Sequence, residues 1–405
     1  MGRCRFSFSF LLLYVFGGFL ITKMKHIPSA IALYGLAFLL LLSFLRCIKY
    51  SNIKELNIGA RLWLPYLTIS ILGYTMFGFF RLSMLWIVPV LIIGISRFFK
   101  INENLPIKYI IYLGGFQVFA LLLQLYIPSI YDRLVTTYYG EDFKEFGTGL
   151  QGFTEQTSLL ASILLLTMAT LLYYVVRNKK NWQKIIVVII FVALIMLTGK
   201  RSFFLMAIMI PILIYLLSQK QQSAFFFVSV FLFLILTFAL PYFVENAEQY
   251  SYIPGIEKIA STFSEEESDD VFNGREILWA AAIDGFLYNP VLGIGTGRYM
   301  AWTGFDTNAH NMYLQVLCEQ GVVGLLFFVV PLFVCLVQTI NLLKKIPQGI
   351  KYKDSLKFSL FVQFFFIIYG MSGNPTRNES CFLMYYIAIG ILVDCYRLNL
   401  KENER

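Results

Sequence analysis

The feature that most constrains this chain is a series of apolar runs, each about 15–20 residues long and separated by short charged patches. A run of that length crosses a hydrocarbon core of roughly 30 Å as a helix. Inside lipid no water is available to the backbone, so each segment must satisfy its own polar groups, as a helix does. The short alternating segments that a membrane barrel requires are absent from the sequence. The sequence therefore predicts an all-α, polytopic membrane protein of about twelve transmembrane helices.

A long polar segment interrupts the series before its tenth member. The expected spans lie near residues 6–22, 28–45, 62–80, 82–98, 109–127, 156–176, 185–199, 202–218, 223–243, 322–340, 356–371 and 381–396. This order divides the chain into helices one to nine (1–243), a large loop (244–321), and helices ten to twelve with a tail (322–405). Residues 128–155 form a second long connection. Loops of this length commonly carry function. No internal repeat is evident, which disfavours a transporter built on symmetry.

The basic residues predict an orientation. The net charge is +9, which in a soluble protein would suggest nucleic acid. Most of the lysines and arginines flank the apolar runs, where they orient spans, so we expect no nucleic-acid partner. With the N-terminus inside, the inner face receives Arg46, Lys49, Lys54, Arg97, Lys100, Arg177, Lys179, Lys180, Lys344, Lys345, Lys351, Lys353, Arg397 and Lys401. Both termini are then cytoplasmic, and the large loop faces the periplasm or the exterior.

The N-terminus and the cysteines fit the same prediction of a membrane protein. Arg3 and Arg5 precede an apolar run that could be a signal peptide, but no small-residue cleavage site follows, which favours an uncleaved first span. The six cysteines form no CxxC pair and suggest neither a disulfide framework nor a zinc site. Several of them fall in apolar runs and are expected to pack as small hydrophobic side chains.

The large loop contains a predicted helix of about three turns. Asn273 can cap its start, and Glu276 favours the positive end of its dipole. It ends before Pro290. The stripe expected to face the membrane domain consists of Ile277, Ala281 and Ala282, with Leu278 and Phe286 beside it. Arg275 lies in the first turn, where its charge opposes the dipole and would welcome an anion.

Gly293, Gly295 and Gly297 follow this helix. No strand precedes them, so they are weak evidence for a dinucleotide loop. They fit a tight, irregular backbone near the bilayer surface, and an approach to a phosphate is the alternative. The acidic stretch 264–270 is typical of a solvated surface; a calcium loop beginning at Asp269 would have Val271 and Ala280 at ligand positions.

Two groups in this region carry chemistry. His310 lies at a predicted helix start between Asn308 and Asn311, which favours anion binding or proton transfer over the packing role usual for a lone histidine. The helix that it opens should stop at Gly321. Lys200 and Arg201 lie between two spans on the outer side, where they either reach lipid head groups or serve a site.

The order of these motifs resembles a known family. A Thr-Gly-Lys-Arg-Ser turn is followed by Gly-Arg-x-x-x-Trp, by Asn-Pro-x-x-Gly-x-Gly, and by Ala-His-Asn-x-Tyr-Leu-x-x-x-x-Glu-x-Gly before an apolar span. Over about residues 198–330 this is similar to the O-antigen ligase and O-antigen polymerase superfamily, and the span layout extends the likeness to the whole chain. One departure is Lys200, where a small residue is common in the family.

The resemblance implies a glycosyltransferase of the bacterial inner membrane that needs no metal or other cofactor. Its substrates would be an undecaprenyl-pyrophosphate-linked oligosaccharide and a glycan acceptor. The enzyme would lie among membrane lipids, and a chain-length regulator would be a partner expected from the family. The products would be O-antigen, capsule or exopolysaccharide if the enzyme is a repeat-unit polymerase. A ligase to lipid A core or protein is the alternative, and a transporter, supported only by the span count, is the second.

The resemblance also implies roles for single residues. Arg201 and Arg275 would hold the pyrophosphate as catalytic cations, and His310 would serve the reaction centre. The residues expected to bind substrate are Lys200, Asn308, Asn311, Tyr313 and Glu319. Glu155, Asp306 and Glu319 are carboxylates that could share the proton transfer with His310, and the sequence does not choose among them. Packing is the alternative for Tyr313.

Overall fold

The computed structural model describes residues 61–63, 65–66, 104–140, 149–154, 156–218, 275–347, 350–376 and 379–403. Their secondary structure is helical, and no strand occurs within these ranges. The chain divides into two compact units. The central unit comprises the described residues between 104 and 218, and the C-terminal unit comprises residues 61–66 as described and those from 275 onward. The expected spans 6–22, 28–45, 82–98 and 223–243, and most of 62–80, lie outside the described residues.

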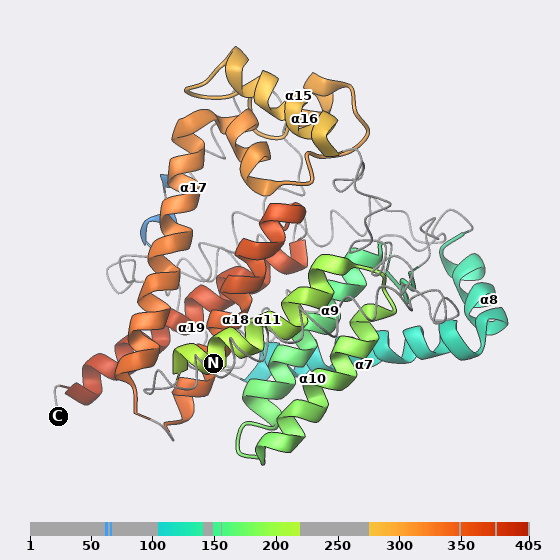
Figure 1. The fold of residues 1–405 in the computed structure, drawn as a ribbon, viewed down its shortest axis with the longest axis vertical. Coiled ribbons are helices and arrows are strands. Elements are labelled where there is room, and N and C mark those ends of the chain that lie inside the picture. The colour runs from blue at the N-terminus through green and yellow to red at the C-terminus, as the bar shows by residue number, and fades with distance from the viewer. Residues whose placement is uncertain are drawn as a thin grey trace, which may run out of the picture. The chain divides into compact units, whose positions relative to one another are not determined.

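The central unit is built around one buried helix. Its elements are α7 (Asn104–Tyr126), α8 (Pro128–Tyr138), α9 (Thr157–Thr170) with a π-helical turn at η4 (Leu171–Val175), α10 (Asn181–Met196) and α11 (Arg201–Ser218). Helices α7, α10 and α11 pack against α9, and α10 and α11 run side by side (Figure 1). Every residue from Leu160 to Thr170 is buried, which explains why α9 is apolar on all sides.

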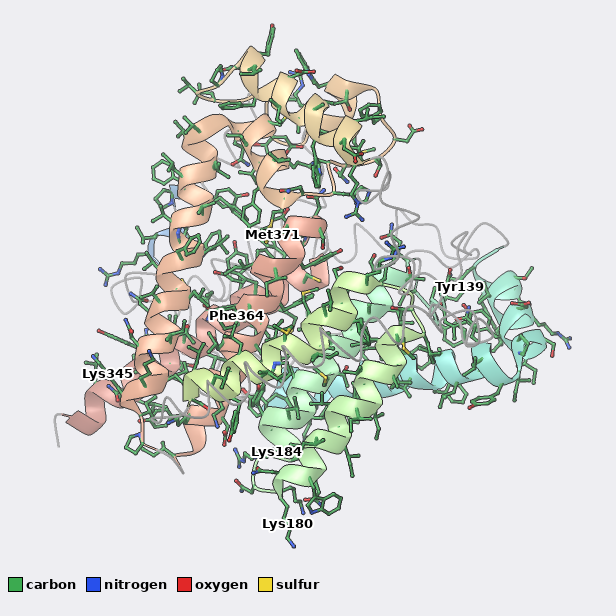
Figure 2. The ribbon with its side chains drawn as sticks, viewed as in Figure 1. Tyr139, Lys180, Lys184, Lys345, Phe364 and Met371 are labelled. Carbon is green, nitrogen blue, oxygen red and sulfur yellow. The ribbon has the colours of Figure 1, made fainter. Side chains whose placement is uncertain are left out.

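The C-terminal unit consists of α15 (Arg275–Tyr288), α16 (Tyr299–Thr303), α17 (Met312–Lys345), α18 (Lys351–Ser372) and α19 (Glu379–Asn403). Helix α18 packs against both α17 and α19. At their centre the Trp63 ring lies edge-on to the rings of Tyr385 and Tyr386, at centroid distances of 5.5 and 5.4 Å. Figure 2 shows how densely side chains fill the space around α18, on which Phe364 and Met371 are labelled. This core is the base on which the loop motifs rest.

Polar side chains join the three long helices inside this core. The Nε2 atom of Gln363 on α18 donates to Thr339 Oγ1 on α17 at 2.7 Å and to Ser359 Oγ at 3.0 Å. Ser359 Oγ in turn donates to the carbonyl oxygen of Ala388 on α19 at 2.7 Å. A hydrogen bond between helices gives a polar group in a membrane a partner that lipid cannot offer.

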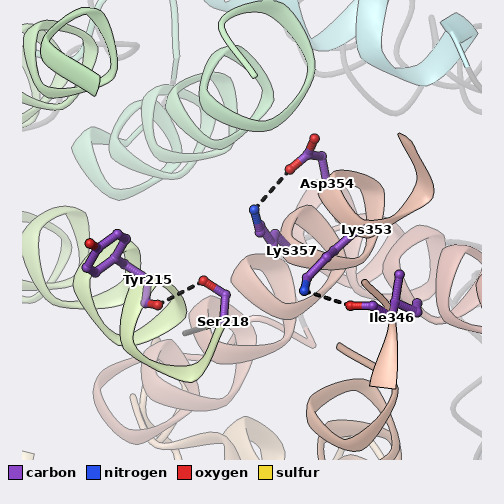
Figure 3. A network of polar contacts seen from close by, with 6 residues as sticks. All are labelled: Tyr215, Ser218, Ile346, Lys353, Asp354 and Lys357. Carbon is purple, nitrogen blue, oxygen red and sulfur yellow. Dashed lines mark hydrogen bonds and ion pairs between the residues drawn. The ribbon is translucent and has the colours of Figure 1, made fainter. Parts of the chain in front are cut away.

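The turn between α17 and α18 is basic. Lys344 and Lys345 lie in the last turn of α17, where a positive charge complements the helix dipole. Lys353 donates its Nζ to the carbonyl oxygen of Ile346 at 2.8 Å, and Lys357 pairs with Asp354 at 3.0 Å (Figure 3). This turn is one of those that we expect on the cytoplasmic side.

Seven of the expected spans fall on described helices, namely α7, α9, α10, α11, α17, α18 and α19. Within the described residues, five helices are long and apolar enough to cross a membrane, namely Ile107–Tyr126, Thr157–Val175, Arg201–Ser218, Met312–Lys345 and Tyr352–Ser372, and α19 is not one of them. The apolar helix Asn181–Met196 is shorter. The chain is thus an all-helical, multi-pass membrane protein in the parts described. The orientation of its termini and the total of about twelve spans stay predictions.

One expectation for the large loop is confirmed and another needs correction. The helix that begins at Met312 ends at Gly321, whose φ of 65° and ψ of −167° are not helical, and a second helix follows this kink within the range of α17. On α15 the buried residues are Ala282 and Gly285, whereas Ile277 is exposed. The physical reason is close approach: a Cβ atom at Gly285 would lie 2.5 Å from Cys318 Sγ, so this face of α15 must carry small residues. The expected helix itself is confirmed at Arg275–Tyr288.

Candidate functional site

The first feature of the candidate site is the end of α18, where several segments of the C-terminal unit meet. The Nη1 atom of Arg275 donates to the carbonyl oxygen of Ser372 at 3.1 Å. Asn311 Nδ2 reaches the neighbouring carbonyl of Met371 at 3.4 Å, and the backbone N–H of Met312 donates to Gly373 at 3.1 Å. Carbonyl groups at a helix C-terminus carry partial negative charge, so a guanidinium is stabilised there. Arg275 is therefore held at the end of another helix rather than left at the positive end of its own.

Helix α15 brings Arg275 and the His310 segment together. Trp279 lies four residues after Arg275 and so on the same face of α15. Its Nε1 donates to the carbonyl oxygen of Ala309 at 3.0 Å. One helix face thus contacts both the end of α18 and the residue before His310. The motif that contains Arg275 and Trp279 and the motif that contains His310 are thus brought together by α15.

His310 has an unusual backbone. Its φ is 50°, and among the described residues no other non-glycine residue has a positive φ. A left-handed conformation is unfavourable for a side chain with a Cβ, and such residues cluster at functional sites. The Nε2 atom of His310 lies 3.0 Å from Thr307 Oγ1. The side chain is half-buried, so it is oriented by the loop and still reachable by a substrate.

Asn308, Asn311 and Tyr313 serve structural contacts around His310. Asn311 caps α17 by accepting hydrogen bonds from the N–H groups of Tyr313 and Leu314 at 3.0 and 3.1 Å. Asn308 Oδ1 accepts from Gln315 Nε2 at 2.9 Å. The hydroxyl of Tyr313 donates to the carbonyl oxygen of Ile367 at 2.9 Å. These contacts fix the start of α17, and with it the direction of His310.

Glu319 holds the glycine-rich segment. It is 4% exposed, and its carboxylate accepts hydrogen bonds from the N–H groups of Gly297 at 2.8 Å and Tyr299 at 3.4 Å and from Gln315 Nε2 at 3.0 Å. Hydrogen bonds to a carboxylate are stronger than those between neutral groups. The geometry therefore assigns Glu319 a positioning role, although substrate contact remains the expectation from sequence.

The glycine-rich segment is not arranged as a phosphate cradle. Gly293, Gly295 and Gly297 all have positive φ values, of 71°, 106° and 82°, as a tight irregular backbone requires. Their N–H groups donate within the protein: that of Gly293 to Asn289, that of Gly295 to the backbone carbonyl of Glu319, and that of Gly297 to the Glu319 carboxylate. These contacts support the interpretation of the glycines as a tight, irregular backbone and not the alternative of an approach to a phosphate.

Arg201 begins α11 in the central unit and Lys200 directly precedes it, and both are half-buried. The turn before them is packed against the segment 149–154. The N–H of Leu150 donates to the carbonyl oxygen of Leu197 at 2.8 Å, and a Cβ atom at Gly149 would lie 2.1 Å from the carbonyl oxygen of Thr198. Gly199, with φ 65°, provides the reversal of direction.

The segment 149–154 is itself held by two glutamines of α7 that sequence analysis did not single out. Gln124 Oε1 accepts from the N–H groups of Gln151 at 3.1 Å and Gly152 at 2.9 Å, and Gln117 Oε1 accepts from that of Phe153 at 3.1 Å. Gln117 is fully buried. Two glutamines seven residues apart in an apolar helix were the available signal, because such side chains need a partner inside a membrane.

Gln315 is a further residue that sequence analysis missed. Its Oε1 accepts from the Ala309 N–H at 3.3 Å and from Asn374 Nδ2 at 2.7 Å, while its Nε2 donates to Asn308 and Glu319. The signal was spacing: residues 311, 315 and 319 lie four apart and share one face of a helix. Glu155 and the possible cap Asn273 lie outside the described residues, and Asp306 is exposed.

The described residues contain no group of three or more His, Cys, Asp or Glu side chains placed to hold a metal ion. The four cysteines described, Cys318, Cys335, Cys381 and Cys395, are buried. This confirms the packing role expected for cysteines in apolar runs.

A comparison with protein families gives a match over part of the chain. No curated protein matches the chain. A family model described as O-Antigen ligase matches residues 185–329, a range that includes Arg201, Arg275, His310 and Glu319. The match covers the last helices of the central unit and, in the C-terminal unit, α15, α16 and the first part of α17, but not the end of α18. Over residues 185–329 the chain is therefore similar to the O-antigen ligase and polymerase superfamily of glycan-processing enzymes.

Proposed function

We propose that this protein transfers a glycan from a polyprenyl pyrophosphate carrier to a hydroxyl group of an acceptor sugar, as a repeat-unit polymerase. The observation that supports the proposal is the meeting of Arg275 and the His310 segment through one face of α15, within the region that matches the family. Proteins of this family act on lipid-linked glycans and acceptors. The reaction would take place on the outer side of the membrane.

The chemistry requires a cation at the leaving group. The acceptor hydroxyl attacks the anomeric carbon, the bond from that carbon to the phosphate oxygen breaks, and the polyprenyl pyrophosphate departs with the bonding electrons. A guanidinium presents its N–H groups in a rigid fork that suits a diphosphate. Fixed cations in a partly dry site contribute several kcal/mol to such a transition state. Arg275, fastened to the end of α18 by Ser372, is the group that we assign to the departing diphosphate.

The acceptor must lose a proton as it attacks. His310 is half-buried and oriented by Thr307 and by the capped start of α17, so its imidazole is suited to take that proton. General-base catalysis of this kind is worth about 10²–10⁴-fold in rate. Glu319 would act through others, by holding the glycine-rich segment beneath the site.

Arg201 is assigned to the same diphosphate, with Lys200 beside it. Energetic coupling tests this assignment. Arg201→Lys and Arg275→Lys keep the charges but remove the fork, and each should lower kcat/KM by about 10-fold or more. If both side chains act on one diphosphate, the double variant should lose less than the product of the two single losses. Independent, multiplicative losses would contradict the shared role.

The direct test is turnover of a defined substrate. Purified protein in lipid nanodiscs, given a polyprenyl-pyrophosphate-linked repeat unit, should produce a ladder of longer glycans. Arg275→Ala and His310→Ala should abolish the ladder, whereas Arg133→Ala, an exposed cation on α8, should leave it unchanged. Full activity of the Arg275 and His310 variants would refute the site.

A ligase is the second candidate, because the matching family model is described as O-Antigen ligase. The two functions share the donor and the leaving group and differ in the acceptor. A product that forms only after lipid A core or another separate acceptor is added would identify the ligase. A ladder formed from the donor alone would identify the polymerase.

A further inference from the structure

An exposed apolar surface lies beside the candidate site, on α15, α16 and the segment between them. Leu287 and Tyr288 at the end of α15, Val291 and Leu292 in the following segment, and Trp302 on α16 are all among the exposed large hydrophobic residues. We call these five residues the apolar wedge. The rings of Tyr288 and Trp302 pack with centroids 4.7 Å apart, so the two helices present one continuous surface. Soluble monomeric proteins rarely expose a contiguous apolar patch that has no binding partner.

The wedge is fastened to a defined point on α17. The N–H of Val322 donates to the carbonyl oxygen of Pro290 at 2.9 Å, and that of Val323 donates to Val291 at 3.3 Å. These two amides are available because Gly321 breaks the helical hydrogen bonding just before them. A Cβ atom at Gly321 would lie 2.3 Å from the Val291 carbonyl oxygen, so the contact is close. The depth of the wedge in a membrane therefore follows from the depth of Val322.

The length of α17 gives that depth. Its last turn carries Lys344 and Lys345, which we take to lie at one membrane surface. A hydrocarbon core of about 30 Å corresponds to about 20 helical residues. Counting back from Lys344 by that number reaches the neighbourhood of Gly324. The opposite surface of the hydrocarbon core thus falls about where the wedge is attached.

The lipid-facing side of α17 is continuous with the wedge. The exposed large hydrophobic residues of this helix are Val322, Leu326, Phe327, Val330, Phe333 and Val337. Their spacing puts most of them along one side of the helix. The stripe begins at Val322, the residue bonded to Pro290, so the apolar surface continues from the helix into Val291 and Leu292. Tyr and Trp rings are typical of the zone where a protein meets lipid head groups.

We propose that the apolar wedge inserts into the surface of the lipid bilayer, so that α15, α16 and the glycine-rich segment lie at the level of the lipid head groups. Interfacial segments of this kind bury their apolar face by about 5–10 Å. The proposal does not depend on the enzymatic activity, because it follows from the exposed residues and the length of α17. It would bring the candidate site to the depth at which the phosphates of a membrane-anchored donor lie.

Spin labels measure this depth directly. The four described cysteines are buried, so Cys4 and Cys47 are replaced by Ser and a nitroxide is attached at Leu287→Cys or Leu292→Cys in nanodiscs of phosphatidylethanolamine and phosphatidylglycerol. Both labels should collide preferentially with oxygen, which concentrates in lipid, over a water-soluble nickel chelate. Leu326→Cys on the lipid-facing stripe is the matched positive control, and Glu276→Cys, exposed at the other end of α15, is the aqueous control.

The other outcomes overturn the proposal. Labels at 287 and 292 that collide with the nickel chelate as often as the label at 276 would put the wedge in water. Labels shielded from both reagents and immobilised would mean that a protein partner or a second copy covers the wedge. A second measurement uses the native Trp302 side chain, whose fluorescence is the difference between the signals of the native protein and the Trp302→Phe variant. Lipids brominated near the head group should quench this fluorescence. An unquenched signal would equally contradict insertion.

Discussion

The left-handed backbone at His310 allows the chemical role of this residue to be separated from its structural role. With φ at 50°, any residue with a Cβ atom pays a conformational cost of roughly 1–2 kcal/mol, and glycine does not. His310→Ala removes the imidazole and its contact with Thr307 but keeps this cost. His310→Gly removes the same side chain and relieves the backbone. Comparison of the two variants therefore measures the free-energy cost of the left-handed backbone at residue 310.

The expected difference in stability is modest and has a definite sign. Relief of the strained φ favours the Gly variant by roughly 1–2 kcal/mol, whereas the greater freedom of glycine in the unfolded chain disfavours it by about 0.4–1 kcal/mol. The Gly variant should therefore be more stable than the Ala variant by about 1 kcal/mol, roughly a fivefold change in the local opening equilibrium. Hydrogen exchange of peptides that cover residues 305–312, measured in nanodiscs, reports this equilibrium.

Activity, unlike stability, should not distinguish the two variants. Both variants lack the imidazole, so both should lose about 10²–10⁴-fold in the rate of glycan transfer, despite their different stabilities. An active His310→Gly variant would refute the general-base role. Stronger protection in the Ala variant than in the Gly variant would refute the argument about the backbone. An Ala variant that regains activity with added imidazole would support proton transfer.

Three further substitutions test the packing around the site. Glu319→Ala removes the acceptor of the Gly297 N–H, so exchange at Gly297 should rise by about 10- to 100-fold for a loss of about 1.5–3 kcal/mol, and unchanged exchange would contradict the positioning role. Gly321→Ala brings a Cβ atom to 2.3 Å from the Val291 carbonyl oxygen and should destabilise the protein by several kcal/mol in a thermal unfolding measurement. The control is Gly304→Ala, where φ is 72° but no atom lies near the added Cβ, so the expected cost is only about 1–2 kcal/mol. Equal losses would contradict the close approach. Gln124→Leu removes the acceptor of two N–H groups and should raise exchange across residues 149–154 by about 10-fold or more, whereas Gln124→Glu should restore protection; failure of that rescue would argue against the contact.

The helices could be read from the sequence because the membrane leaves few choices. In the described residues, each expected span falls on a helix: α7, α9, α10, α11, α17, α18 and α19. An apolar run of sufficient length has to satisfy its own backbone in lipid, so length and composition alone are decisive. The helix at Arg275–Tyr288 was also predictable, since Pro290 limits it at one end.

The contacts of the site were decided by the tertiary structure. Local sequence put Arg275 at the positive end of its own helix, but the fold offers it the negative end of α18, a residue 97 positions away. The same holds for the contacts of Glu319, because the amides of Gly297 and Tyr299 that donate to its carboxylate belong to another segment. The buried face of α15 was misjudged at Ile277 because the close approach of Cys318 to Gly285 selects small residues there. Hydrophobic periodicity and helix length are local properties of a chain, whereas the partner of a charge depends on which segments the fold brings beside it.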